Sequence, residues 1–284
     1  MPITLMCITN DPDVARIAEK NGVDRIWIDL ETLGKEERQK NMDCVKSHHT
    51  INDIKIMSKV LTNSELMVRI NPWNTNSKRE IEDVISAGAQ RIMLPMWKTP
   101  KEVDEFLRFV NQRTATTLLL ETKEAAECID DILCNPLLDE IHIGLNDLHL
   151  SYNLKFMFEL LANGVVEELC KKMNTAGIKY GFGGIAKIGC GMLPAENILP
   201  EHYRLGSTRA ILSRSFCNPC SFSDIHDVEK CFETEMKKLK RYEEAAGNMS
   251  SSELNKNKQC VKETVDEIVK NIEEKANECQ YKRA

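Results

Sequence analysis

Eight short apolar segments, each followed by a stretch with helical periodicity, constrain most strongly what this chain can fold into. Alternating strands and helices are typical of parallel sheets, because the chain must return through a crossover before it can pair again in the same direction. Eight such units fit within residues 1–246, which matches the repeat count and the length of a (β/α)8 barrel. We therefore predict an α/β protein of this fold, with strands at 3–9, 25–30, 65–70, 91–95, 116–120, 140–143, 178–182 and 209–212.

The C-terminal part of the chain differs from these units. Residues 247–259 are polar and rich in Ser and Asn, so we expect a linker between the barrel domain, 1–246, and a last helix, 260–284. A narrow apolar stripe runs along that helix, formed by Val261, Val265, Ile268, Val269, Ile272 and Ala276. Such a stripe needs a surface to pack against. The barrel or a neighbouring subunit could supply it, and a final packing helix is the simpler interpretation.

Composition excludes several classes of protein. Hydrophobic residues make up 42% of the 284 residues, which is enough for a sizeable core, and the net charge of −6 gives no overall basic field for nucleic acid or an anionic membrane. No segment approaches the roughly 18 apolar residues of a membrane span, and no basic leader opens the chain. The 11 cysteines follow no framework spacing, and the pair Cys217 and Cys220 has no second pair at zinc spacing. We expect a cytoplasmic protein with free thiols.

Charged and polar residues gather where the predicted strands end. The active sites of these barrels lie at the carboxyl ends of the strands, so these residues are expected to share one rim. Buried together, they would be costly unless a metal or an anionic ligand were paired with them. The residues at the strand ends are Asp29, Glu31, Arg69, Asn71, Glu121, Asn146, Asp147, Ser213 and Arg214.

Glu121 and Asp147 follow adjacent strands, so their carboxylates can share one hard cation. Two carboxylates, completed by water and a chelating substrate, suit Mg²⁺ or Mn²⁺. Arg69 is placed to orient and stabilise an oxyanion or a carboxylate. Taken singly, each of these residues could be an ordinary strand-end cap or surface charge, but as a set on successive strand ends they favour a functional site.

Two other features have competing interpretations. The segment 181–186, GFGGIA, satisfies a loose dinucleotide-binding pattern, but that pattern also requires a helix to begin there. Gly189, Gly191 and Pro194 make a helix improbable, so a turn or a close backbone approach fits better. His48 and His49 lie in the insert after the second strand; they are either surface residues or, if this loop covers the rim, a proton shuttle.

Five motifs occur in order along successive predicted strands. Their sequences are VDRIWIDLE at 23–31, VRINP at 68–72, IMLPMWKT at 92–99, LLET at 119–122 and IGLNDL at 143–148. Together they resemble the 2-keto-3-deoxy-acid aldolase and citrate lyase β-subunit family, within the phosphoenolpyruvate/pyruvate barrels. The resemblance covers about residues 1–220. Each motif is modest alone, and the ordered set is specific.

The resemblance implies a metal-dependent aldolase, a carbon–carbon lyase that works through the enolate of a pyruvate-type 2-oxo acid. It implies that Glu121 and Asp147 bind Mg²⁺ or Mn²⁺ and that Arg69 contacts the keto or enolate oxygen. It also implies that the backbone amides of Gly144, Leu145 and Asn146 hold the substrate carboxylate. The family is often hexameric, so we expect a homo-oligomer.

Two positions depart from the aldolase branch. That branch has a His directly after the acid of its D-x-E motif, where this chain has Thr32, and a Gln where this chain has Leu119. Both departures point toward the citrate-lyase-like branch. The segment HHTIND at 48–53 nevertheless resembles the aldolase segment after that acid, so His49 could supply the base from beyond an insertion. The proton shuttle stays unassigned, with His49 and Asp29 as candidates.

Three alternatives remain open at this point. A citrate-lyase-like enzyme would act on an acyl-CoA thioester and would need a basic entrance, which Lys35, Arg38 and Lys40 could supply. A non-catalytic ligand-binding barrel would account for Thr32 and Leu119. A dinucleotide oxidoreductase would account only for the Gly-rich segment. The expected partners are therefore small molecules, a 2-oxo acid or an acyl-CoA, and neither nucleic acid nor a membrane.

Overall fold

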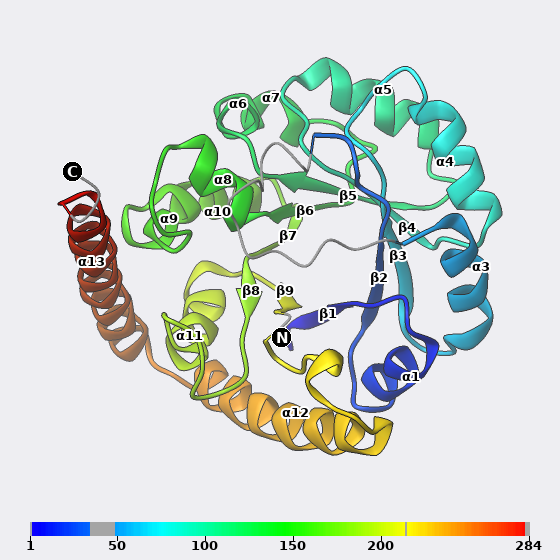
Figure 1. Ribbon diagram of the computed structural model, residues 1–284. Helices are drawn as coiled ribbons and strands as arrows, with labels where there is room; N and C mark the ends of the chain where they lie inside the picture. Colours follow the sequence, from blue (N-terminus) through cyan, green and yellow to red (C-terminus); the bar gives the residue numbers. More distant parts are fainter. Residues whose placement is uncertain (1, 35–48, 214, 282–284) are drawn as a thin grey trace.

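The computed structural model describes residues 2–34, 49–213 and 215–281 (Figure 1). Parallel strands form one sheet that curls around an axis, and helices surround it (Figure 1). The predicted (β/α)8 barrel is confirmed, because every predicted strand segment contains a strand. The strands are β1 (Thr4–Ile8), β2 (Arg25–Asp29), β3 (Glu65–Arg69), β4 (Arg91–Leu94), β5 (Ala115–Leu120), β6 (Glu140–Ile143), β7 (Lys179–Phe182), β8 (Gly184–Ile185) and β9 (Arg209–Leu212).

The helices lie on the outer side of the sheet and connect successive strands. The segment after β5 forms two short helices, α6 and α7, which meet at Cys128, and the segment before β7 contains the separate helices α9 and α10. The helices are α1 (Pro12–Lys20), α3 (Ile51–Val60), α4 (Ser77–Ser86), α5 (Pro100–Val110), α6 (Lys123–Glu127), α7 (Ile129–Leu133), α8 (Leu145–Ser151), α9 (Glu159–Ala162), α10 (Val165–Thr175), α11 (Ala195–Leu205), α12 (Ile225–Gly247) and α13 (Ser251–Tyr281), with a 3-10 turn at Pro219–Ser221.

The seventh repeat contributes two strands, because glycine interrupts it. The sheet order is β7-β6-β5-β4-β3-β2-β1-β9-β8, so β7 pairs with β6 and β8 pairs with β9. Gly183, between them, has φ +56°, a conformation that glycine adopts readily. Gly181 lets the two ends of the sheet meet, since a Cβ there would lie 2.3 Å from the carbonyl oxygen of Arg209. The Gly-rich segment thus serves close backbone approach, and no helix follows it until Ala195.

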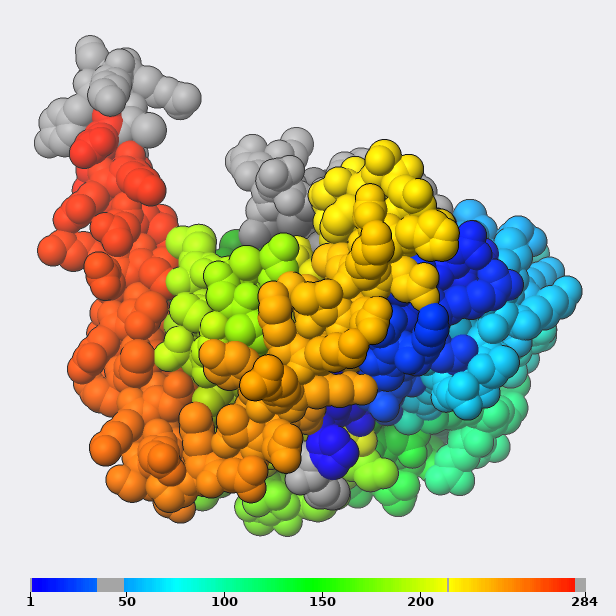
Figure 2. Space-filling model, turned by 90° about the horizontal axis from the view of Figure 1, so that it is seen from below, coloured from blue at the N-terminus to red at the C-terminus, as the bar shows by residue number. Residues whose placement is uncertain are grey.

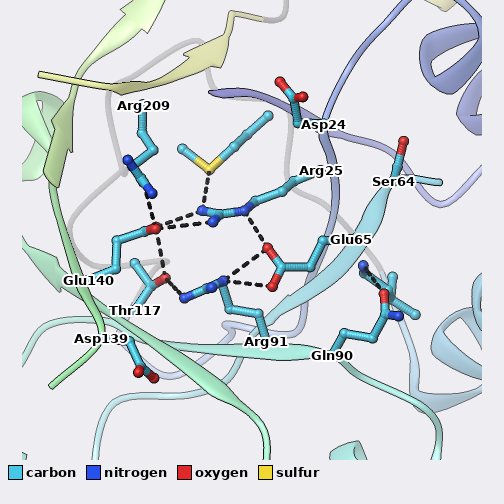
Figure 3. Close-up of polar contacts among 12 residues, drawn as sticks. Asp24, Arg25, Ser64, Glu65, Gln90, Arg91, Thr117, Asp139, Glu140 and Arg209 are labelled. Atoms are coloured by element: carbon cyan, nitrogen blue, oxygen red, sulfur yellow. Dashed lines mark hydrogen bonds and ion pairs between the residues drawn. The ribbon is translucent and has the colours of Figure 1, made fainter. Parts of the chain in front are cut away.

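The first residues of several strands form a largely buried ion network at the amino-terminal end of the barrel, which we call the lower network (Figure 3). Glu140 receives two hydrogen bonds from Arg25, at 2.6 and 3.0 Å, and one of 2.6 Å from Arg209. Glu65 pairs with Arg25 at 2.5 Å and with Arg91 at 3.0 Å. Because each carboxylate is shared by two guanidinium groups, the charges compensate one another inside the barrel.

An apolar layer separates this network from the carboxyl ends of the strands. Its members point inward from alternate positions of successive strands, as the side-chain period of a strand requires. The layer comprises Met6, Trp27, Met67, Met93 and Leu119, packed against Ile8 and Ile211. The barrel interior is therefore a packed core, and the upper rim is where polar side chains can meet a ligand.

The C-terminal segment differs from the expected linker. α13 begins at Ser251, so most of the range 247–259 is helical. Ser250 and Glu253 form a capping box: the N–H of Ser250 donates to Glu253 Oε2 at 2.8 Å, and the N–H of Glu253 donates to Ser250 Oγ at 3.3 Å. The Ser-rich composition therefore marks a helix start. α13 packs on α9 and α11, and its last turns rise beyond the barrel wall (Figure 2).

Three further observations concern the described residues. None of the helices in the described ranges is long and apolar enough to cross a bilayer. Nine described cysteines are free thiols, including Cys217 and Cys220. In the predicted apolar stripe on α13, Val261 and Val265 are buried, and Ile268, Val269 and Ile272 are partly buried against the core. Ala276 is exposed, so the stripe packs on the barrel only as far as Ile272.

Candidate active site

Four acids and one arginine gather at the carboxyl ends of β2, β3, β5 and β6. Asp29 and Arg69 are the last residues of β2 and β3, and Glu121 follows β5 directly. Asp147 is the third residue of α8, which starts after β6. The sequence prediction of a shared rim is supported by the electrostatics, because the charges of Arg69 and Asp147 both act on Glu121.

Asp29 and Arg69 form a two-point pair at adjacent strand ends. The guanidinium donates from Nε and from Nη2 to the two carboxylate oxygens, each at 2.8 Å. The face of the guanidinium lies over the Trp27 ring, 5.0 Å from its centroid. Burial alone would lower the pKa of Arg69, but the carboxylates of Asp29 and Glu31 raise it. Arg69 is therefore a fixed and permanently charged group.

Glu31 belongs to the site, although sequence reasoning did not assign it a role. Its Oε2 lies 3.3 Å from Nη2 of Arg69, and its side chain is buried. The signal was available, since Glu31 stands two residues after Asp29 and the sequence places both at the same strand end. Asn71 accepts hydrogen bonds from the N–H groups of Thr32 and Leu33, at 2.9 and 3.0 Å, and so fixes the chain that carries Glu31.

Glu121 is buried in an environment that disfavours its charged form. Burial and, next, repulsion from Asp147 raise the pKa of Glu121 well above its usual value, and Arg69 offsets part of the shift. The backbone N–H of Met96 donates to Glu121 Oε1 at 3.0 Å. Met96 has φ +53°, an uncommon conformation for this residue type. The chain after β4 is thus bent so that an amide faces the carboxylate.

The segment predicted to hold a substrate carboxylate lies beside Glu121. Gly144 donates its N–H to the carbonyl of Leu120 at 2.9 Å, so this amide is already engaged. The amides of Leu145 and Asn146 fall in the first turn of α8, where N–H groups have no partner within the helix. The Leu145 side chain is buried in the core, so its amide is the only polar donor that this residue could offer a ligand.

His49 stands at the end of β2, next to Asp29. The backbone N–H of Asp29 donates to Nδ1 of His49, with a distance of 3.0 Å between the two nitrogens. The side chain is half-buried. Of the other residues predicted near this loop, His48, Lys35, Arg38 and Lys40 lie outside the described residues.

The donor set at this rim fits a hard divalent cation. Glu121 and Asp147 supply carboxylate oxygens, which Mg²⁺ and Mn²⁺ prefer, and their mutual repulsion would be relieved by a positive ion. Within the described ranges, no group of three His, Cys, Asp or Glu side chains could hold a metal ion.

Fold and rim together define a (β/α)8 barrel with an acidic site around a fixed arginine. Residues 3–159, more than half of the chain, match the HpcH/HpaI aldolase/citrate lyase family. The protein belongs to this family, whose members are aldolases and lyases, as the sequence motifs predict. No curated protein matches the chain in sequence.

Solved structures of other proteins share the fold. An HpcH/HpaI aldolase from Desulfitobacterium hafniense superposes with a TM-score of 0.58 at 15% identity, over 84% of this chain and 93% of that one. Citrate synthase SbnG gives 0.57 at 15% identity, over 84% and 94%. The CitE protein from Mycobacterium tuberculosis, solved with magnesium and pyruvate, gives 0.55 at 15% identity, over 81% and 90%. At such identities the likeness establishes the fold alone.

Proposed function

We propose that this protein is a divalent-metal-dependent carbon–carbon lyase that forms or breaks a bond next to a pyruvate-type 2-oxo acid. The observation on which this proposal depends is that Glu121 lies within electrostatic reach of both Asp147, with which it could share one hard cation, and the fixed guanidinium of Arg69. CitE, whose solved structure holds magnesium and pyruvate, supports this combination of ion and substrate class.

Glu121 and Asp147 would hold the ion, Mg²⁺ or Mn²⁺, between β5 and α8. A bound ion of this kind supplies a Lewis acid that polarises the keto oxygen of a chelated 2-oxo acid. The buried position of Glu121 limits access of water to this carboxylate. Loss of either carboxyl group is therefore expected to remove metal-dependent turnover while the barrel stays folded.

Arg69 would stabilise the negative charge that develops on the enolate oxygen. Its two bonds to Asp29 and its contact with Trp27 hold the guanidinium in one orientation before the substrate arrives. Such preorganised charge is effective because it needs no rearrangement during the reaction. The apolar layer below, which includes Leu119 and Met93, keeps water from the underside of the site.

The amides of Leu145 and Asn146 would bind the substrate carboxylate, with Gly144 shaping the backbone beside Glu121. The first turn of a helix offers N–H groups and a favourable dipole to an anion. This arrangement is compatible with chelation, because the carboxylate would then lie next to the ion held by Asp147, two residues along the same turn. Asp29, at the end of β2, and His49, which contacts its backbone, would be the candidates for the group that carries a proton to or from the substrate carbon.

Deuterium exchange into the methyl group of pyruvate tests this function. Exchange followed by NMR is expected with Mg²⁺ or Mn²⁺ and is expected to disappear with EDTA and in Glu121→Gln and Asp147→Asn. Glu124→Gln, at an exposed carboxylate paired with Lys98, is the matched control and should exchange normally. If the wild-type protein binds the ion and still shows no exchange, the proposal fails, and the thioester enzyme or the non-catalytic barrel becomes the better interpretation.

We further propose a homo-oligomer in a reducing, cytoplasmic compartment. The free thiols of the described cysteines support such a compartment, because unpaired cysteines are typical of reducing surroundings. Light scattering checks the first statement, and a strict monomer would contradict it. Thiol titration of freshly isolated protein checks the second, and recovery of disulfide-bonded protein would contradict it.

A further inference from the structure

We infer that Asn71 and Glu80 act together as a positioning pair for Arg69, the residue proposed above to stabilise the enolate. The pair acts through the chain that follows β2, which carries Glu31 to the guanidinium group. This inference deepens the proposed function and rests on it, because its effect on turnover requires that Arg69 acts on the substrate. Its structural part, the hold on the chain, can be measured without any reaction.

The side chain of Asn71 binds the backbone just beyond the point where the sheet stops binding it. The pairing of β2 with β3 ends at Arg69, whose carbonyl accepts a hydrogen bond from the N–H of Leu30 at 2.9 Å. The N–H groups of Thr32 and Leu33 donate instead to Oδ1 of Asn71, at 2.9 and 3.0 Å. One side-chain oxygen therefore fixes the chain that leaves the strand.

Glu80, in the first turn of α4, determines which way the amide group of Asn71 faces. Its Oε1 accepts a hydrogen bond from Nδ2 of Asn71 at 2.8 Å, and its two oxygens also lie 3.2 and 3.3 Å from the backbone nitrogen of Asn71. A carboxylate can only accept, so it selects the NH₂ side of the amide and leaves Oδ1 for the N–H groups of Thr32 and Leu33. The opposite orientation would set NH₂ against two other donors.

The carboxylate of Glu80 has a cost that this orienting role explains. Its side chain is half-buried, and within the described ranges no cation pairs with it. Burial raises the pKa of Glu80, and the hydrogen bonds from Asn71 offset only part of this shift. A neutral amide at this position should therefore leave the stability of the fold unchanged or raise it. A loss of turnover in such a variant would then report on positioning.

The chain held in this way presses a second carboxylate against the guanidinium group. Oε2 of Glu31 lies 3.3 Å from Nη2 of Arg69, and the same nitrogen donates to Asp29 at 2.8 Å. The backbone N–H of Glu31 donates to Oδ1 of Asp29 at 3.2 Å. A shift of this chain would therefore disturb Glu31, Asp29 and the orientation of Arg69 together. Because the enolate charge develops only during the reaction, the loss should fall on kcat more than on KM.

Hydrogen exchange of two backbone amides tests the structural part. Thr32 and Leu33 are exposed, so protection of their N–H groups depends on the hydrogen bonds to the oriented amide. NMR of protein labelled with ¹⁵N-Thr and ¹⁵N-Leu is expected to show at least about ten-fold faster exchange of both in Glu80→Gln. Glu82→Gln, on the same helix at a carboxylate paired with Arg113, is the matched control and should keep wild-type rates. Unchanged rates in Glu80→Gln would overturn the inference, whatever reaction the protein catalyses.

Deuterium exchange into pyruvate tests the effect on turnover. Glu80→Gln and Asn71→Ala should each lower kcat by about ten-fold and change KM by less than about three-fold, and Glu82→Gln should react normally. Since the two residues act as one unit, the double variant should lose no more than either single variant.

Three results would contradict the positioning role. These are losses that multiply in the double variant, a loss confined to KM, and a thermal midpoint of Glu80→Gln below that of the wild type, which would make the role one of stability. Absence of deuterium exchange in the wild-type protein would instead show that the proposed function fails. The amide measurement would still decide whether Glu80 orients Asn71.

Discussion

Gly144 lies so close to Glu121 that a Cβ atom at position 144 would stand 3.0 Å from Oε2 and 3.1 Å from Cβ of the glutamate. The backbone of Gly144 has φ −83°, which any residue can adopt, so the glycine is required by space and not by conformation. The missing side chain lets α8, with Asp147 in its first turn, approach the carboxyl group that ends β5.

Gly144→Ala is therefore expected to weaken the binding of Mg²⁺ or Mn²⁺ by about ten-fold, equivalent to about 1.4 kcal/mol. The added methyl group must displace the Glu121 side chain or move α8, and either change alters the spacing of the two carboxylates. Isothermal titration of the metal measures the effect. The thermal midpoint of the metal-free protein should also fall, because the methyl group enters packed space beside Glu121 and Leu119 although the backbone conformation is unstrained.

Gly184→Ala is the matched control for this substitution. Gly184 lies in the wall of the same barrel, and a Cβ there would meet its nearest neighbours at 3.5 and 3.8 Å, which are ordinary contact distances. Its metal affinity should equal that of the wild type. If Gly144→Ala binds metal as tightly as Gly184→Ala, the close approach to Glu121 has no part in the site.

Glu121→Gln is expected to stabilise the metal-free protein. Burial and the charge of Asp147 raise the pKa of Glu121, so the folded chain holds this proton more firmly than the unfolded chain. Stability is then lost as the pH rises through the window between the ordinary and the raised pKa. A neutral amide removes that loss at pH 7, and we expect a gain of about 1 kcal/mol.

Thermal unfolding with and without Mg²⁺ checks whether Glu121 lowers the stability of the metal-free protein while it binds the ion. The wild-type midpoint should rise with the ion, by mass action on the folded state, whereas the midpoint of Glu121→Gln should be higher from the start and insensitive to it. A variant that is less stable than the wild type without metal would show that the carboxylate contributes to the fold. A variant that still responds to Mg²⁺ would remove Glu121 from the metal site.

The sequence contains more information about the barrel than about the site. The strands could be predicted because each is a short apolar run between polar segments, a signal that tertiary contacts reinforce. The rim acids could be predicted because every strand of such a barrel ends at the same side. The direction of each side chain could not, so the pairing of Asp29 with Arg69 and the contact of Glu31 with the same guanidinium needed coordinates.

Backbone details of the site were also beyond the sequence. Nothing in the residue type of Met96 indicates a positive φ, yet this bend aims its amide at Glu121. The bond from Asp29 to His49 depends on where β1 stops pairing, and strand ends are poorly defined in a sequence. The linker prediction for 247–259 failed for a different reason: Ser250 and Glu253 carry a capping signal that composition obscured.

Glu140→Gln is expected to destabilise the protein by about 3–5 kcal/mol, because it leaves Arg25 and Arg209 buried without their shared carboxylate. Those guanidinium groups hold the pKa of Glu140 at about 2, so the carboxylate is charged over the whole neutral range. Urea unfolding measures the loss. Metal-dependent exchange per folded molecule should remain, since the apolar layer separates this network from the rim.

Glu124→Gln provides the comparison for that measurement, because its ion pair with Lys98 is about half exposed on both sides. A pair of this kind contributes less than about 1 kcal/mol. Similar losses in Glu140→Gln and Glu124→Gln would contradict the view that the lower network holds the barrel together.

The pH dependence of stability should reflect two buried histidines. Burial lowers the pKa of His202 from 6.5 to about 3 and that of His142 to about 4, so both rings are neutral in the folded protein. The unfolded chain binds protons that the folded chain does not, and stability is therefore complete above the ordinary pKa and falls as the pH drops below it. Each histidine contributes about 1.4 kcal/mol per pH unit within its window.

His202→Asn, whose amide can still bond Ser207, should lower the slope of unfolding free energy against pH between 6 and 4.5. Urea unfolding across this range measures the slope, which is independent of the packing lost when the ring no longer stacks on Phe182. His226→Asn, at a largely exposed ring, should leave the slope unchanged. An unaltered slope in His202→Asn would show that this ring is already protonated in the folded protein.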